Sequence, residues 1–284
     1  MKLLDTIKSK QDNTIKQVFL SNGDVLEFSY IDKRDGKDIV VVPTQTSCNL
    51  GCKFCFLTGL NIAVRNLKPY EMIDGVKYAL TTFRNENKIL LVSFMGCGEP
   101  LLSIDKTIWA MKELANCGYD YNLIRFAVAS LVPSYRHLEL FTDAVKENHL
   151  LVKFHYSLHT SDDTLRKTLM PAAIISKNAI NGLKTYNKVT GNAVEIHYSL
   201  MNNLNDSDKD AEDLSKLISG TGFNVKILKL SEKDSALQGS NRVNEFREIL
   251  TKNGIDNEYY EPPGSDVGSS CGQFLLDYYI RYGR

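Results

Sequence analysis

The chain has 284 residues, of which 43% are hydrophobic, and this is enough for one sizeable α/β domain or two small ones. Its 34 basic and 34 acidic side chains give a formal net charge of zero, which argues against strong non-specific binding to nucleic acid. The first residues, MKLLDTIKSKQDN, lack the apolar stretch of a signal peptide, and no apolar run is long enough to cross a bilayer. These features predict a cytoplasmic protein without a membrane partner. In that compartment clustered cysteines bind metal or do chemistry more often than they form disulfides.

Residues 1–37 are predicted to form an N-terminal extension that comprises a helix and a β-hairpin. The hairpin is KQVFLSNGDVLEFSYI (16–31), in which two apolar runs flank Asn22 and Gly23. Asn-Gly is a strong signal for a two-residue hairpin turn, because both residues tolerate positive φ.

From residue 38 onward, short β-rich runs alternate with amphipathic segments. The predicted strands are 38–43, 89–95, 123–130, 151–158, 193–200 and 223–230. The predicted helices lie near 70–87, 103–117, 135–147, 175–190, 207–219 and 241–252. This alternation predicts repeated βα units and a parallel sheet. Six units are too few for a closed eight-stranded barrel, so the expected fold class is α/β, a partial (β/α)6 TIM-like barrel over residues 38–258.

The last segment, 259–284, is predicted to be a loop followed by a short aromatic helix. It contains Pro262, Pro263 and Gly264, which favour a loop, and it carries Cys271.

The stretch TSCNLGCKFCFLTG places Cys48, Cys52 and Cys55 within eight residues, directly after the first core strand. In parallel α/β folds the chemistry gathers at the carboxyl ends of the strands. The C-x3-C-x2-C spacing lets three thiolates converge on one iron–sulfur cluster, and a cluster of four irons then keeps one iron open. The alternatives are a zinc site, which would want a fourth thiolate or imidazole, and plain buried thiols.

A second motif, FMGCGEPLLS (94–103), follows the second strand. Alone, its GEP would fit a turn before a helix, but its position one βα unit after the cysteines favours a binding role. Further polar groups end the next three strands, and their hydroxyl, imidazole and amide groups suit a ribose and an adenine edge. Each could also be a helix N-cap or a loop residue. They are Ser130, Ser157-Leu158-His159 and Asn205.

The cysteine motif, with Phe54 before its last cysteine, resembles that of radical S-adenosylmethionine (SAM) enzymes. The resemblance implies that Cys48, Cys52 and Cys55 hold a 4Fe–4S cluster whose open iron binds the methionine end of SAM, and that an electron from the cluster cleaves the sulfonium to a 5′-deoxyadenosyl radical. It also implies that Gly98 and Glu99 hold the methionine amino group, through a charge-assisted hydrogen bond. The remaining SAM contacts would come from the residues at the later strand ends, Ser130, Ser157, Leu158, His159 and Asn205.

Within that superfamily the chain resembles the RlmN/Cfr group, whose members methylate carbon atoms of adenosine in RNA. The resemblance runs from about Val25 to Gln273, and its most diagnostic part is SSCGQF (269–274). It implies methylation of C2 or C8 of adenosine in rRNA or tRNA, through a methyl group first placed on Cys271. It further implies RNA and a flavodoxin- or ferredoxin-like electron donor as partners, and we expect a monomer. The alternative for Cys271 is a small buried residue in a Gly/Ser turn.

Two other residues enter through the resemblance, Glu27 and Cys97. Glu27 would be a base at the substrate, and its alternative is a solvated strand residue. The family releases its RNA thioether with a second cysteine seven residues before the first cluster ligand, and that position is Val41 here. We expect Cys97 to take over that step, unless the reaction ends in another way. Cys117 is expected to be a packing residue.

The resemblance also implies a difference in size. The family has an N-terminal helical domain that helps to hold RNA, and only 47 residues precede the first cluster cysteine here, so we expect this domain to be lacking or to be supplied by another chain. Few phosphate contacts are therefore expected, although such contacts normally dominate nucleic-acid affinity. Two other readings stay open. One is a radical SAM enzyme that acts on a nucleotide, a small metabolite or a glycyl-radical partner. The other is a degenerate cluster-binding regulator.

Overall fold

The structure is a computed structural model that describes residues 1–33, 35–60, 62–83, 89–231, 237–269 and 273–275. The described residues form one ten-stranded sheet in which every strand pairs with the next along the chain. The strands from β1 to β4 pair antiparallel, and those from β4 to β10 pair parallel. The sheet has two edges, β1 and β10, so the predicted partial barrel is confirmed.

The strands are β1 (Lys2–Lys8), β2 (Thr14–Ser21), β3 (Asp24–Asp32), β4 (Lys37–Val41), β5 (Ile89–Phe94), β6 (Leu123–Ser130), β7 (Val152–Ser157), β8 (Val194–Ser199), β9 (Asn224–Leu228) and β10 (Asn257–Tyr260). The helices are α1 (Pro69–Phe83), α2 (Ile104–Ala115), α3 (Tyr135–Glu147), α4 (Asp163–Leu169), α5 (Ser176–Thr190), α6 (Asp208–Ile218) and α7 (Val243–Lys252), with short 3-10 turns at η1 (Pro100–Leu102) and η2 (Ser265–Val267).

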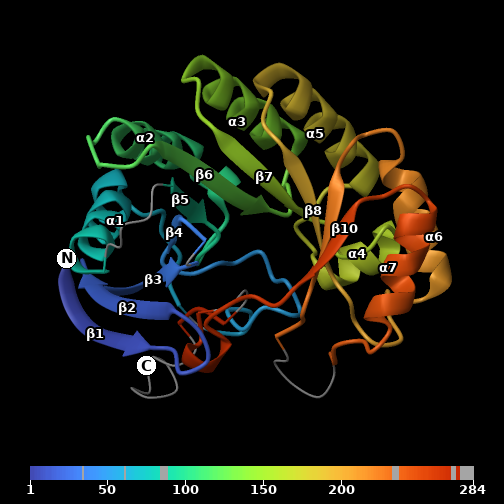
Figure 1. Cartoon of the computed structure of the whole chain (residues 1–284), viewed down its shortest axis with the longest axis horizontal. Helices are drawn as coiled ribbons and strands as arrows, with labels where there is room; N and C mark the ends of the chain where they lie inside the picture. The colour runs from blue at the N-terminus through green and yellow to red at the C-terminus, as the bar shows by residue number, and fades with distance from the viewer. Residues whose placement is uncertain (34, 61, 84–88, 232–236, 270–272, 276–284) are drawn as a thin grey trace.

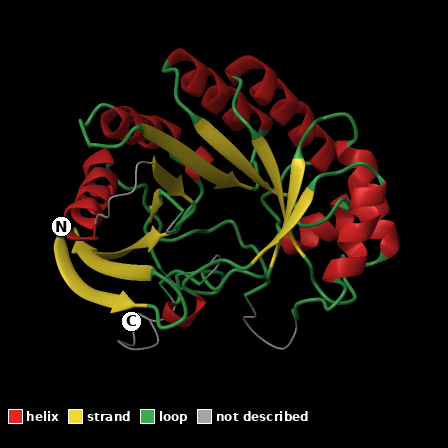
Figure 2. Ribbon diagram, viewed as in Figure 1, coloured by secondary structure: helices red, strands yellow, loops and turns green. Residues whose placement is uncertain are grey.

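The outer face of the curved sheet is covered by α1, α2, α3, α5, α6 and α7, and long loops lie on its inner side (Figures 1 and 2). The short helix α4 lies at the carboxyl ends of β6 and β7. On β7, Phe154 points outward and packs against Phe141 of α3 and Tyr186 of α5. Since side chains alternate along a strand, its neighbours Lys153 and His155 face inward. The outer face therefore holds the apolar core, and the inner face is free to carry polar groups.

The predicted hairpin and the six predicted βα units are confirmed, with ends that differ by a few residues. Asn22 and Gly23 form the hairpin turn and both have positive φ, 53° and 87°. Besides strand β1, described below, the sequence analysis missed the two-turn helix α4 and the edge strand β10, which is too short and too polar to give a clear strand pattern.

The predicted N-terminal helix is wrong, because residues 2–8 form strand β1. This strand pairs antiparallel with β2, with one irregularity between Leu3 and Asp5. The hairpin edge offers unpaired backbone N–H and C=O groups, and pairing with them outweighs the local helix preference of a short segment. At the other end, residues 262–264 lie in a loop as predicted. The predicted aromatic helix falls on residues 276–284, outside the described residues.

In the part of the chain that the structure describes, no helix has both the length and the apolar character needed to cross a bilayer.

Gly75 marks the closest approach of α1 to the sheet. A Cβ atom built there would lie 2.2 Å from Cε1 of Phe28, a residue of β3 that is fully buried. We expect Gly75→Ala to destabilise the protein by about 1–3 kcal/mol, because overpacking outweighs a helix-propensity gain of about 0.5–1 kcal/mol. Urea unfolding measures the difference. Asp74→Ala, on the exposed side of the same helix, is the control and should not destabilise. Equal stability of Gly75→Ala and the wild type would contradict this packing.

Candidate active site

The cysteine loop begins where β4 ends and is held at its base by Thr46. The Thr46 backbone N–H donates to the carbonyl of Arg65 at 3.0 Å, and its hydroxyl donates to the carbonyl of Ala63 at 2.9 Å. Arg65 is held in turn by ion pairs with Asp24 (2.6 Å) and Glu71 (2.7 Å). The start of the cysteine loop is therefore bonded to its end, and Arg65 anchors that end to Asp24 of β3 and Glu71 of α1.

The three thiols are only partly exposed, and they lie between two small apolar clusters. Cys48 and Cys55 pack against the cluster around Val18, and Cys52 packs against the cluster around Met170. Burial raises the pKa of Cys48 to about 11 and raises the pKa of Cys52 further, and the neighbouring thiols oppose ionisation as well. Such thiols become thiolates when a cationic centre binds among them. The donor set therefore fits a cluster held by three cysteines.

Gly98 and Glu99 form a shelf beside this loop. Gly98 has φ of 104°, and a Cβ atom there would lie 2.7 Å from Cβ of Gln45, so the position requires glycine. Gln45 accepts a hydrogen bond from the Glu99 backbone N–H at 2.9 Å and donates to Oδ1 of Asn66 at 2.8 Å. The shelf is thus locked to the start of the cysteine loop.

The Glu99 side chain is 4% exposed, and its two oxygens point to the ends of β5 and β6. Oε1 accepts from the backbone N–H of Leu101 at 3.0 Å, and Oε2 accepts from that of Leu131 at 3.3 Å. Burial raises the pKa of Glu99 to about 7, although the Ser130 hydroxyl and the two N–H groups act against this shift. A buried carboxylate in this position can bind an ammonium group, because the attraction between the two charges would offset the free-energy cost of removing the carboxylate from water.

The residues predicted at the later strand ends lie at the same rim of the sheet, but His159 can contact a ligand whereas Asn205 bonds to the backbone. His159 accepts from the backbone N–H of Ser199 through Nδ1 at 2.9 Å, and its ring meets Phe54 of the cysteine loop edge-on at 4.9 Å. Nδ1 is therefore occupied, and Nε2 is the nitrogen left for a ligand. Asn205 donates to the carbonyls of His159 (2.5 Å) and Ser199 (2.9 Å) and accepts from Met201 N–H (2.6 Å). Its amide thus holds the ends of β7 and β8 in place.

Arg166 of α4 is a site residue that the sequence analysis missed. Its guanidinium is 1% exposed and donates to the carbonyls of Leu158 (2.7 Å), Ser157 (3.1 Å) and Leu131 (3.0 Å). It joins the ends of β6 and β7, and its charge counteracts the rise in the pKa of Cys52. A cation on an amphipathic helix usually lies on the surface, so no pattern in the sequence signalled this role.

Glu27 is buried, which makes the alternative of a solvated strand residue wrong. It forms an ion pair with Lys16 of β2 at 2.9 Å, and both side chains are inaccessible to solvent. Its Oε2 also accepts from the backbone N–H of Leu275 at 2.6 Å. This buried carboxylate therefore ties the chain just beyond Cys271 to the hairpin, whereas Cys271 itself falls outside the described residues.

Cys97 is 3% exposed and lies close to the cluster loop. Burial raises its pKa well above the ordinary value, and Cys48, Cys55 and Glu27 contribute to the rise. Val41 packs against the same apolar cluster that contains Cys97. Cys117 lies apart from the site at the end of α2, where its thiol donates to the Leu114 carbonyl at 2.8 Å.

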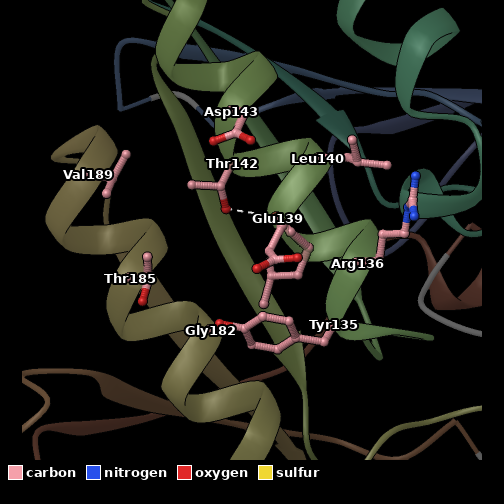
Figure 3. Close-up of a pocket in the computed structure, with 10 residues that line it drawn as sticks. Tyr135, Arg136, Glu139, Leu140, Thr142, Asp143, Gly182, Thr185 and Val189 are labelled. Atoms are coloured by element: carbon pink, nitrogen blue, oxygen red, sulfur yellow. Dashed lines mark hydrogen bonds between the residues drawn. The ribbon is translucent and has the colours of Figure 1, made fainter.

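Away from this rim, a groove of about 530 Å³ lies between α3 and α5 on the outer face (Figure 3). Tyr135, Leu140 and Thr185 line it, and none of the predicted site residues that the structure describes does. Gly182 allows the two helices to approach, because a Cβ atom there would lie 2.6 Å from Leu138. The groove is therefore a consequence of helix packing and is separate from the cysteine site.

Comparisons with known proteins agree with this geometry. The Radical SAM superfamily matches residues 42–215. The chain is 30% identical to the probable dual-specificity RNA methyltransferase RlmN of Lachnoclostridium phytofermentans over 97% of its length and 77% of that protein. It is 32% identical to the corresponding protein of Lachnospira eligens, over 95% and 77%. In three dimensions it is similar to a radical SAM methyltransferase from Sphaerobacter thermophilus, with a TM-score of 0.82 and 26% identity over 96% of this chain and 80% of that one.

These matches include the cysteine loop, the Glu99 shelf and the strand ends described above. Membership of this superfamily implies a 4Fe–4S cluster and SAM as cofactors, and the C-x3-C-x2-C spacing of Cys48, Cys52 and Cys55 agrees with it. The chain belongs to the radical SAM superfamily and, within it, to the family of the RlmN proteins.

Proposed function

We propose that this protein is a radical SAM methyltransferase that methylates a carbon atom of adenosine in RNA. The observation that carries the proposal is the similarity to proteins named RlmN over 95% or more of the chain. The substrate is rRNA or tRNA and the target is C2 or C8. A flavodoxin- or ferredoxin-like protein supplies the electron, and the enzyme acts in the cytoplasm as a monomer.

In this proposal the described residues bind and orient the cofactors. Cys48, Cys52 and Cys55 hold the cluster, which supplies the electron that cleaves the sulfonium of SAM. Glu99 takes the ammonium group of SAM, and Gly98 lets the backbone approach it. The Nε2 atom of His159 and the hydroxyl group of Ser157 face the nucleoside part, with Leu158 beside them. Ser130 acts through Glu99, because its hydroxyl bonds to that carboxylate and accepts from the Val132 N–H. Asn205 and Arg166 keep these strand ends in register.

Cys271 carries the methyl group in this proposal, and Glu27 acts close to it. The hydrogen bond from Leu275 N–H to Glu27 holds the chain four residues beyond Cys271 against the hairpin. Lys16 forms an ion pair with Glu27 at 2.9 Å, and this contact orients the carboxylate. The sulfur of Cys271 attacks as a thiolate, so its proton must leave before the methyl group arrives.

The role of Cys271 leads to the first test. We expect the reconstituted wild type, given SAM, a reductant and RNA from cells that lack the protein, to methylate adenosine and to carry a methyl group on Cys271. Cys271→Ala should lose all methyl transfer but still release 5′-deoxyadenosine, because the cluster cysteines are intact. Mass spectrometry detects all three products. Cys117→Ala is the control and should act as the wild type. Methylation by Cys271→Ala, or none by the wild type, would refute the proposal.

The raised pKa of Glu99 predicts a pH-dependent affinity for SAM. The carboxylate binds an ammonium group and the protonated acid does not, so affinity should fall as pH drops below about 7. The limit is about tenfold per pH unit. Equilibrium dialysis between pH 6 and 7.5 measures the slope. Glu99→Gln should bind SAM weakly at every pH, whereas Glu113→Gln, an exposed residue of α2, should keep the wild-type profile. An unchanged slope in Glu99→Gln would assign the titration to another group.

Cys97 is proposed to release the RNA by attack of its thiolate on the sulfur of Cys271. A Cys97–Cys271 disulfide forms, the bond from that sulfur to the methylene carbon breaks, and this carbon keeps the electron pair and takes up a proton to become the methyl group. A thiol reductant in the assay then restores both cysteines. The thiol is buried among neighbours that oppose its ionisation, and Glu27 is one of them, so the Cys97 proton must be taken up as the thiol attacks. We expect Cys97→Ala to stop after one turnover and to accumulate a covalent protein–RNA adduct, visible on a denaturing gel. Many turnovers by Cys97→Ala would show that the reaction ends in another way.

A further inference from the structure

A second group of metal-ligating side chains lies on the inner face of the sheet, on different strands from the cysteine loop. It consists of His155 of β7 and of Glu195 and His197 of β8, which are 7%, 1% and 9% exposed. In the part of the chain that the structure describes, the ligand atoms of these residues lie within 4.8 Å of one another. The ring of His155 lies 4.5 Å from that of His197.

The three ligand atoms face a common point. Nδ1 of His155 lies 2.7 Å from Nε2 of His197 and 2.9 Å from Oε1 of Glu195, and Nε2 of His197 lies 3.6 Å from the same oxygen. One proton on Nδ1 of His155 can point at only one of its two neighbours. A cation at the centre would instead be shared by two imidazole lone pairs and one carboxylate oxygen, at the cost of a small expansion.

The protonation states also suit a metal. Burial lowers the pKa of His155 to about 3 and lowers that of His197, so both rings are neutral at pH 7. For Glu195, burial acts to raise the pKa, but hydrogen bonds from the two histidines and Lys153 hold it well below its ordinary value. Two neutral imidazoles and one carboxylate are the donors that zinc and ferrous iron accept in proteins.

The surrounding groups hold Glu195 in position for such a role. Lys153 and Asn224 both donate to Oε2 at 2.7 Å, which leaves Oε1 on the side of the histidines. Lys226 contacts Oε1 at 2.9 Å and competes with a metal there, but it has a second carboxylate partner, Glu258, at 2.9 Å. A metal ion could therefore replace Lys226 on Oε1 without leaving this ammonium group unpaired.

We propose that His155, Glu195 and His197 form a binding site for a first-row divalent cation, with Zn²⁺ as the reference ion. The site lies on the inner wall of the barrel and is separate from the cluster cysteines. Three protein ligands leave at least one position for water or for an anionic oxygen of a substrate. This inference does not depend on RNA methylation.

The test is the zinc content of the cluster-loaded protein, equilibrated without oxygen against Zn²⁺ buffered by a weak chelator. We expect the wild type to retain one equivalent of zinc that Glu195→Gln and His197→Ala do not, with a loss of affinity of about 100-fold or more. Zinc should also raise the Tm of the wild type and not that of either variant, because the ion binds only the folded state. His137→Ala, which removes a half-buried histidine of α3 on the other face of the sheet, should bind as the wild type does.

Lys226→Met keeps all three ligands and removes the competing ammonium group, so it should bind zinc more tightly than the wild type. This variant decides the matter if Glu195→Gln or His197→Ala fails to fold. Either of two results would overturn the proposal: a wild type that takes up no zinc beyond that of the Glu195 variant, or a folded Lys226→Met protein that binds less zinc. The three residues would then be one part of an ion-pair network across β7, β8 and β9.

Discussion

The parallel pairing of β4 to β10 is the constraint on which the site depends. Because these strands run in one direction, their carboxyl ends meet at a single rim, and each loop that follows a strand opens onto the same space. Cys48, Glu99 and His159 are far apart in the sequence, yet they follow β4, β5 and β7 and therefore face one another. The contact between the rings of His159 and Phe54 shows that the loop after β7 lies against the cysteine loop. No single loop could supply the thiols, a carboxylate and an imidazole in this arrangement.

The site is built from buried charges that are each matched by a specific partner. Glu27 has Lys16, and Arg166 has three backbone carbonyls. Removal of one partner from such a pair is costly, because it leaves an uncompensated charge in a medium of low polarity. Glu99 differs, since among the residues that the structure describes it has neutral donors and no cation, and its pKa is raised to about 7. The missing positive charge is the feature that suits Glu99 to an ammonium-bearing ligand.

The two faces of the sheet have different functions, because successive side chains of a strand point to opposite faces. On β7 and β8 the outward side chains, such as those of Phe154 and Tyr198, pack against the helices, and the inward side chains of Glu195 and His197 are polar. The outer face supplies stability through apolar burial. The inner face does not have to supply this apolar burial, so it can hold the cysteine site at the rim and a second polar cluster along the wall of the barrel.

The sequence by itself determined the βα alternation, the Asn22–Gly23 turn and the identity of the cluster ligands, because these depend on residue patterns that are local along the chain. It did not reveal strand β1, which forms only because the hairpin presents an edge to pair with. Nor did it reveal that Arg166 and Glu27 are buried, since a charged residue on a helix or a strand looks the same in sequence whether it faces solvent or the interior. The meeting of His155, Glu195 and His197 was also decided by tertiary structure alone. The register between β7 and β8 brings side chains some forty positions apart to within hydrogen-bond distance, and register depends on the whole sheet.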